Sequence, residues 1–424
     1  MRLWFIPLTY AVLAAIFGFT LPRLEHAYLA SYATISVSSA QAFLSAVASG
    51  MMALTGIVFS VAFVVVQFSA VAYSPRLVLW LSRDPLLFHS LGMFMSTFIY
   101  SLSELAWVDR GGSGKVPLFS ALMVAALLLL SMFLFSRLIQ SLHDLQISNI
   151  LHAIGRRGRA VIAEMAERLD ELPEKSRHSP MSAEDTFGPV TQAVTYAGEP
   201  RAIARFDIER LVRIAQRADA VIVMACAVGD TIFDAGLLLS VHGGTATIPQ
   251  RELLRAVELR PERTFEQDPK YPMRLLVDIA IKALSPAVND PTTAVQAIDQ
   301  IEDLLRRLGR RELEAGQERD ASGKLRLVYP MPSWDDYLAL AFDEIRQFGS
   351  TSVQVMRRLR STLVDLVAMQ TDPERAEAVR RYLLHLDLGI ERSPFDEKDR
   401  VTARQEDRQG LGMTRRNSGS VKPS

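Results

Sequence analysis

The feature that most constrains this chain is a long uncharged segment near its N-terminus. Residues 27–75 contain no Asp, Glu, Lys or Arg, although charged residues make up 22% of the whole sequence. As a single helix this segment would be about 73 Å long, whereas the hydrocarbon core of a bilayer is only ~30 Å thick. We therefore expect either more than one membrane-embedded piece or one long span preceded by an approach to it.

Charge is distributed unevenly over the 424 residues, a length sufficient for two or three domains. Most charged residues follow residue 145, which predicts a membrane-embedded N-terminal third and a soluble remainder. The formal net charge is zero, so electrostatics give no reason to expect nucleic-acid binding. The only cysteine, Cys226, cannot form an intramolecular disulfide and is expected to be a small buried apolar residue.

Four segments in the first third are long and apolar enough to cross a bilayer: residues 3–21, 42–72, 86–108 and 116–136. The first is longer than the apolar core of a usual signal peptide, so we interpret it as a span and keep a cleaved signal as the alternative. Between the first two spans, residues 27–40 are either an interfacial approach or an uncharged external loop.

Basic residues after the last span predict the orientation in the membrane. Arg137 follows the fourth span, and Arg156, Arg157 and Arg159 come within the next few helical turns. By the positive-inside rule this side of the membrane is the cytoplasm. Four spans then place both the N-terminus and the C-terminus in the cytoplasm.

The second span carries a regular stripe of small and polar residues. At roughly 100° per residue, its members fall within about 60° of one another and opposite the bulky residues. They are Ser45, Ser49, Gly56, Ser60 and Gln67. Such a stripe is typical of close helix packing in lipid, and it can equally line a polar pathway when several copies surround an axis. The sequence leaves both interpretations open.

Glu104 is an ionisable residue within the third span, about one turn before its end. A charge costs several kcal/mol at mid-membrane but little near the interface. The neighbouring Trp107 and Asp109 favour an interfacial position. The alternative is a carboxylate that attracts cations at the mouth of a pathway.

The rest of the chain is expected to be soluble and mainly helical. Residues 146–189 predict a stalk helix and a Pro-containing linker, and residues 190–246 predict a small mixed α/β domain. Residues 247–390 predict a helical domain, and the charged and Ser-rich segment 391–424 is expected to be disordered. The predicted fold class is therefore mainly α, with four transmembrane helices, a cytoplasmic α+β domain and a helical C-terminal domain.

A tight corner in the helical domain is the candidate site for a ligand. Asn289 or Asp290 can cap a helix that begins with Pro291, and free amides at a helix start can bind an anion. Plain capping between two packed helices is the alternative. A polar cluster before Pro269 could pair with this corner as an interdomain lock or ligand site. The candidate residues are Arg263, Gln267, Asp268, Asn289, Asp290, Thr292 and Thr293.

The sequence shows no catalytic motif that we can identify. Its seven histidines have neither His-x-His nor i, i+4 spacing, so we expect no metal site. We find no nucleotide-binding glycine loop, no Gly-x-Ser-x-Gly elbow and no Cys/His pair. We therefore expect neither a cofactor nor an enzyme activity.

Short motifs along the chain resemble one family. They are Gly-Ile-Val-Phe-Ser at 56–60, Tyr-Ser-Pro-Arg at 73–76, Gln-Ile-Ser-Asn-Ile at 146–150, Arg-Thr-Phe-Glu-Gln-Asp-Pro at 263–269 and Ser-Pro-Ala-Val-Asn-Asp-Pro at 285–291. Together they resemble the bacterial family of predicted membrane proteins called domain of unknown function twenty-two fifty-four, up to about residue 390. The resemblance implies an integral protein of the bacterial envelope, and hence the inner membrane, but carries over no catalytic residues.

Two functional hypotheses follow. The first is a homo-oligomeric channel or transport pathway in which the second span lines an axis and the cytoplasmic part assembles or gates it. The scarcity of charge in the spans favours this over a proton-coupled pump. The second is a membrane-anchored sensor or scaffold, whose stripe only packs helices and whose cytoplasmic part binds a partner or small ligand. Besides the lipid bilayer, the expected partners are further copies of the chain and an ion or small ligand.

Overall fold

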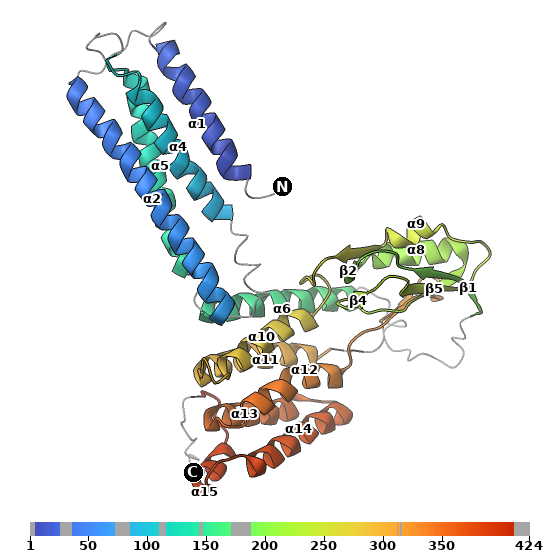
Figure 1. Cartoon of the computed structure of the whole chain (residues 1–424). Helices are drawn as coiled ribbons and strands as arrows, with labels where there is room; N and C mark the ends of the chain where they lie inside the picture. The colour runs from blue at the N-terminus through green and yellow to red at the C-terminus, as the bar shows by residue number, and fades with distance from the viewer. Residues whose placement is uncertain are drawn as a thin grey trace, which may run out of the picture. The chain divides into compact units, whose positions relative to one another are not determined.

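The computed structural model describes residues 5–25, 36–72, 85–109, 116–143, 147–170, 188–311, 313 and 316–410. The chain forms two compact units, Met1–Asn149 and Ile150–Ser424, called here the membrane unit and the second unit. It is mostly helical, as predicted, with four apolar helices first, then sheets with helices, then C-terminal helices (Figure 1). Much of the predicted approach at residues 27–40 lies outside the described residues.

Within the described part of the membrane unit, four helices are long and apolar enough to cross a bilayer. They are α1 (Phe5–Leu24), α2 (Val37–Ala72), α4 (Pro85–Leu105) and α5 (Leu118–His143). The helix α4 contacts each of the other three and is the centre of the bundle. Large apolar side chains such as Phe17, Phe59 and Leu129 remain exposed on the outside, as expected for surfaces that face lipid.

Small residues allow α1 and α4 to approach each other closely. A Cβ atom added to Gly18 would lie 2.7 Å from the Ser103 Cβ, and one added to Gly92 would lie 2.9 Å from the Tyr10 ring. Both distances are too short for carbon atoms in contact. Glycine is therefore required at both positions for this packing, as is common between helices in membranes.

The second unit begins with α6 (Ile147–Asp170) from Ile150 onward. This helix lies against α11 (Pro291–Leu308), where the Arg159 guanidinium pairs with Asp303 at 3.0 Å. A Cβ atom added to Gly158 would lie 2.9 Å from the Leu304 methyl groups. The predicted stalk helix thus packs on the helical part of the second unit.

Two sheets follow in the second unit. One has five strands in the order β1-β5-β3-β8-β7, and the other has three in the order β4-β2-β6. The pair β3–β8 is parallel, with Ile222 opposite Leu327, and the other pairs are antiparallel. The strands are β1 (Val190–Thr195), β2 (Arg201–Phe206), β3 (Ala220–Met224), β4 (Thr231–Ile232), β5 (Leu237–Gly243), β6 (Val257–Arg260), β7 (Gly316–Arg319) and β8 (Leu325–Tyr329).

The sheets also take strands from residues 247–390, the segment predicted to be a helical domain. The strands β6, β7 and β8 come from that segment and complete the sheets begun by residues 190–246. The core of this part includes Phe206, Leu211, Ile222 and Leu327, and α8 (Ile208–Ala218) and α9 (Gln250–Leu254) accompany the strands. A four-residue strand such as β6 is too short to show a period of two.

Six helices make up the rest of the second unit. They are α10 (Lys270–Ala283), α11 (Pro291–Leu308), α12 (Trp334–Phe348), α13 (Val353–Met369), α14 (Pro373–Arg392) and α15 (Glu397–Ala403). The last one corrects the prediction that the segment from residue 391 is disordered. Ala403 is fully buried, and Asp407 pairs with the buried Arg357 at 3.7 Å. Residues 411–424 lie outside the described chain.

Candidate functional site

The stripe predicted on α2 lies on the outside of the membrane unit. Ser45, Ser49, Gly56 and Ser60 are all exposed, and a Cβ atom added to Gly56 would have nothing within 4 Å. The opposite face of α2 carries the buried side chains Leu44, Val47, Met51 and Val58. The stripe therefore does not pack helices within one described copy of the chain. The side chain of Gln67 lies outside the described residues.

The first half of the stripe borders a groove between α2 and α4. Ser45, Ser49 and Ala53 form one side, and the α4 residues Leu102 and Leu105 belong to the other. The groove has a volume of about 540 Å³. Its walls combine hydroxyl groups with apolar side chains, so it can receive a helix from outside the chain.

A buried carboxylate at the end of α1 holds the start of α5. Glu25 is only 1% exposed. Its Oε1 accepts a hydrogen bond from the backbone N–H of Phe119 at 2.8 Å, and its Oε2 accepts from the Ser120 N–H at 3.0 Å and the Ser120 hydroxyl at 2.9 Å. A carboxylate in this position satisfies free amides and is stabilised by the positive end of the helix dipole.

A second carboxylate lies beside it without such donors. Glu104 on α4 is completely buried and lies close to Glu25 and Ser120, but neither of its oxygen atoms has a hydrogen-bond partner. The hydroxyl of Tyr100, one turn earlier on α4, is also buried and unpartnered. Glu104 lies near the end of α4 as expected, and its side chain is buried among the helices.

Sequence reasoning overlooked Glu25, Tyr100 and Ser120. Glu25 is the only acidic residue between the first two predicted spans. This isolation was the sequence feature that could have marked it as a candidate site residue. Its contact with α5 joins residues far apart in the chain, and no local pattern predicts such a contact.

Residues of the polar cluster before α10 make hydrogen bonds to backbone groups of the second unit. Gln267 exchanges two hydrogen bonds with the backbone of Phe206, at 3.0 and 3.1 Å. Asp268 is buried, and its Oδ1 accepts from the backbone N–H groups of Lys270 and Tyr271 at the start of α10. Burial raises the pKa of Asp268 to about 6, although the nearby Arg263 opposes this effect.

The predicted corner lies at the other end of α10. Asp290 caps α11 by accepting from the Thr293 N–H at 3.1 Å and the Thr293 hydroxyl at 2.6 Å. The N–H of Asn289 donates to the Ser285 carbonyl, while Thr292 is exposed. Within the described part of the chain, no hydrogen bond joins this corner to Arg263, Gln267 or Asp268, and α10 separates the two groups by about 20 Å. The corner shows the capping arrangement that the sequence offered as the alternative.

Asp268 also faces a pocket of about 70 Å³ that the sequence did not predict. The side chains of Phe206, Val161 and Met331 form parts of its apolar wall. The described residues that line it include three acids and no Lys or Arg: Glu164, Asp268 and Glu318. The Oδ2 atom of Asp268 is buried without a hydrogen-bond partner. The pocket thus combines apolar walls with negative charge.

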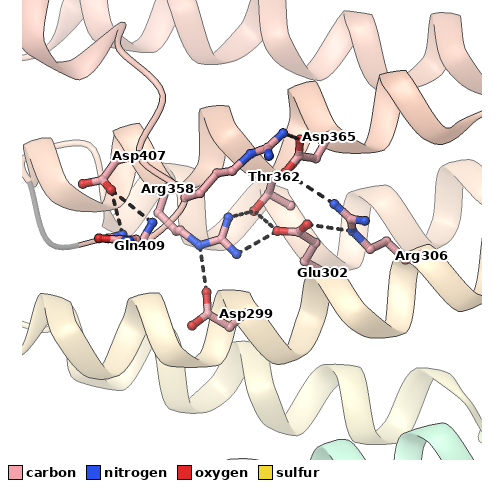
Figure 2. Close-up of polar contacts among 10 residues, drawn as sticks. Asp299, Glu302, Arg306, Arg358, Thr362, Asp365, Asp407 and Gln409 are labelled. Carbon is pink, nitrogen blue, oxygen red and sulfur yellow. Dashed lines mark hydrogen bonds and ion pairs between the residues drawn. The ribbon is translucent and has the colours of Figure 1, made fainter. Parts of the chain in front are cut away.

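Figure 2 shows a separate cluster of charges between α11 and α13. The Arg358 guanidinium donates to Asp299 and Glu302 at 2.7 Å each, and to the Thr362 hydroxyl at 2.8 Å. Arg306 donates to the other oxygen of Glu302 at 2.8 Å. Because every oxygen of the buried Glu302 has a donor, we interpret this cluster as a structural lock between the two helices and not as a ligand site.

Comparison with known proteins agrees with the membrane architecture. No solved structure matches the chain. Two uncharacterized proteins, one from Mycobacterium bovis and one from Mycobacterium tuberculosis, are each 29% identical to it over 374 residues, which is 85% of this chain and 70% of theirs. The family model described as predicted membrane protein (DUF2254) matches residues 1–365. The chain therefore belongs to this family of predicted membrane proteins, which confirms the resemblance found in its motifs.

Proposed function

We propose that the protein is a homo-oligomeric channel or transport pathway of the bacterial inner membrane, with the second unit as its regulatory part in the cytoplasm. The observation that carries this proposal is the exposed stripe on α2. A single copy leaves Ser45, Ser49, Gly56 and Ser60 exposed, and no neighbouring helix covers this face at Gly56. Further copies supply that neighbour when their α2 helices meet around an axis.

Packing in lipid supports an assembly through this face. Helices in a membrane associate where small residues allow their backbones to approach. The hydroxyl of Ser60 donates to the Gly56 carbonyl at 2.9 Å within the same helix, so it needs no other partner and does not prevent a close approach. The groove beside Ser45 and Ser49 provides a concave surface for a neighbouring helix.

Cysteine cross-linking in lipid tests the assembly. In a Cys226→Ser background, Ser49→Cys and Ser60→Cys should form intermolecular disulfides. The matched control is Ile57→Cys, which lies on the same helix, is 59% exposed and lies about 80° around the helix from the centre of the stripe. Equal cross-linking at all three positions, or none at the stripe, would contradict an assembly through this face.

Conductance of the same variants separates a pathway from mere packing. If α2 lines the pathway, a charged thiol reagent on Ser49→Cys should reduce ion flux through reconstituted vesicles, while the same reagent on Ile57→Cys should not. Two results would refute the proposed transport: no ion flux at all, or ion flux that the thiol reagent does not change in either variant. The protein would then be an oligomer without a conduction pathway along α2.

The acidic pocket of the second unit favours a second candidate, a membrane-anchored sensor for a small cation with an apolar body. Asp268 lines this pocket, its buried Oδ2 has no hydrogen-bond partner, and much of the wall is apolar. Because the pKa of Asp268 is about 6, binding should strengthen from pH 5 to pH 7 as the carboxylate ionises. Calorimetry with n-propylammonium tests this, with n-propanol as the uncharged control. Binding that survives Asp268→Asn unchanged would exclude this candidate.

A further inference from the structure

The buried carboxylates Glu25 and Glu104 have unequal surroundings, although they lie close together. Glu25 accepts three hydrogen bonds at the start of α5, which is an environment that stabilises the anion. Glu104 accepts none within the described chain and is fully buried. Two neighbouring carboxyl groups in such different environments are expected to differ in protonation.

Among the described residues, the charged groups around Glu104 do not supply a counter-charge. Arg23 is the described cation on α1, and its guanidinium carbon lies 3.6 Å from the centre of the Phe19 ring and 5.6 Å from that of the Trp107 ring, so it faces two aromatic rings. On α4, the other titratable groups are Tyr100, in the same buried region, and His89, which contacts Tyr10 of α1. Asp109 follows α4 and is acidic.

The two remaining helices add no cation near this end. The part of α2 from Val37 to Val64 has no titratable residue, and α5 has none before Arg137. Arg137 follows Ser120 by about 25 Å along the helix. Among the described residues, an ionised Glu104 would therefore be buried beside an ionised Glu25 without a positive partner, which is strongly unfavourable inside a membrane protein.

We propose that Glu104 carries a proton at neutral pH, and that Glu25 and Glu104 form a binding site for one exchangeable proton in the membrane unit. Glu25 contributes the carboxyl group that accepts the three hydrogen bonds at the start of α5. Tyr100, whose hydroxyl is also buried without a partner, supports the assignment because it adds a polar group to the same site. The site is independent of the proposed pathway along α2, since it requires neither an oligomer nor conduction.

Infrared titration of the full-length protein in lipid vesicles tests this proposal. Wild-type protein at pH 7 should show the carbonyl stretch of a protonated carboxylic acid in a dry environment. The band should shift when the protein is labelled with ¹³C-glutamate, and it should be absent from Glu104→Gln. The control is Glu199→Gln, which removes a carboxylate that is 86% exposed and should leave the band intact.

A further variant distinguishes a proton site from a merely structural role. Glu25→Gln removes the neighbouring negative charge, so the band of Glu104 should persist but disappear at a lower pH than in the wild type. Wild-type protein without a glutamic-acid band at pH 7 overturns the proposal, even if the variants fail to fold. A band that disappears on addition of Na⁺, K⁺ or Ca²⁺ at constant pH would also overturn it, because the site would then hold a metal cation.

Discussion

Replacing Arg358 by methionine tests the charge cluster between α11 and α13. Arg358 is 6% exposed and donates to Asp299, Glu302 and Thr362. Removing one partner of a buried ion pair costs about 3–5 kcal/mol when the other is left alone. Here Glu302 retains donors from Arg306 and Thr362, at 2.8 and 3.0 Å. We therefore expect Arg358→Met to reduce the free energy of unfolding by about 2–4 kcal/mol.

The matched control is the same substitution at an exposed pair. Arg381 donates to Asp335 at 3.1 Å, and their side chains are 58% and 65% exposed. Arg381→Met should change the free energy of unfolding by less than about 0.5 kcal/mol. Urea unfolding of the full-length protein in detergent, followed by tryptophan fluorescence, to which the buried Trp334 contributes, measures both. Equal losses for the two variants would show that the cluster in Figure 2 does not lock the helices together.

Three further predictions concern single groups. Glu25→Ala removes three hydrogen bonds at the start of α5 and should lower stability in lipid by about 1–3 kcal/mol in thermal unfolding, with Glu25→Gln losing less. Gly229→Ala places a methyl group against the Asp268 carboxylate at a φ of +89°, and should destabilise more than Gly323→Ala, whose φ is +85° and whose surroundings are open. Because the folded pKa of Asp268, about 6, lies above its unfolded value of about 3.9, the native state binds more protons between these pH values. Stability should therefore fall by up to about 3 kcal/mol as the pH rises through this window, and Asp268→Asn should remove that slope in urea unfolding at several pH values.

Hydropathy predicted the helices of the membrane unit because each is uniformly apolar over its length. The predicted second span, residues 42–72, ends with α2 at Ala72, and the fourth extends to His143, beyond the predicted residue 136. That extension includes Arg137, which ended the apolar pattern without ending the helix. Composition indicates where a chain can lie in lipid, whereas the end of a helix depends on its backbone hydrogen bonds.

The elements that sequence reasoning missed depend on partners far along the chain. The strand β7 pairs with β8 and contains Glu318 and Arg319, so its composition resembles that of a charged loop. The helix α15 lies in a polar segment, and Ala403 is buried there through contact with distant helices. For the candidate ligand corner, local capping rules predicted Asp290 correctly, but they gave no information about the pocket at the other end of α10.

The stripe on α2 and the carboxylate pair Glu25–Glu104 differ in whether one copy of the chain supplies all of their protein contacts. The helical period of the sequence identified the small-residue stripe on α2, but it did not show what contacts this stripe. The structure shows that α4 takes the opposite face, including Leu44 and Val58, so the stripe needs lipid or another copy. Glu104 is enclosed within one copy, and its missing counter-charge requires a proton or cation and not a subunit. If the protein is monomeric, Ser49→Cys should form no cross-links, but the infrared band of Glu104 should remain. The two experiments therefore test the assembly and the proton site independently.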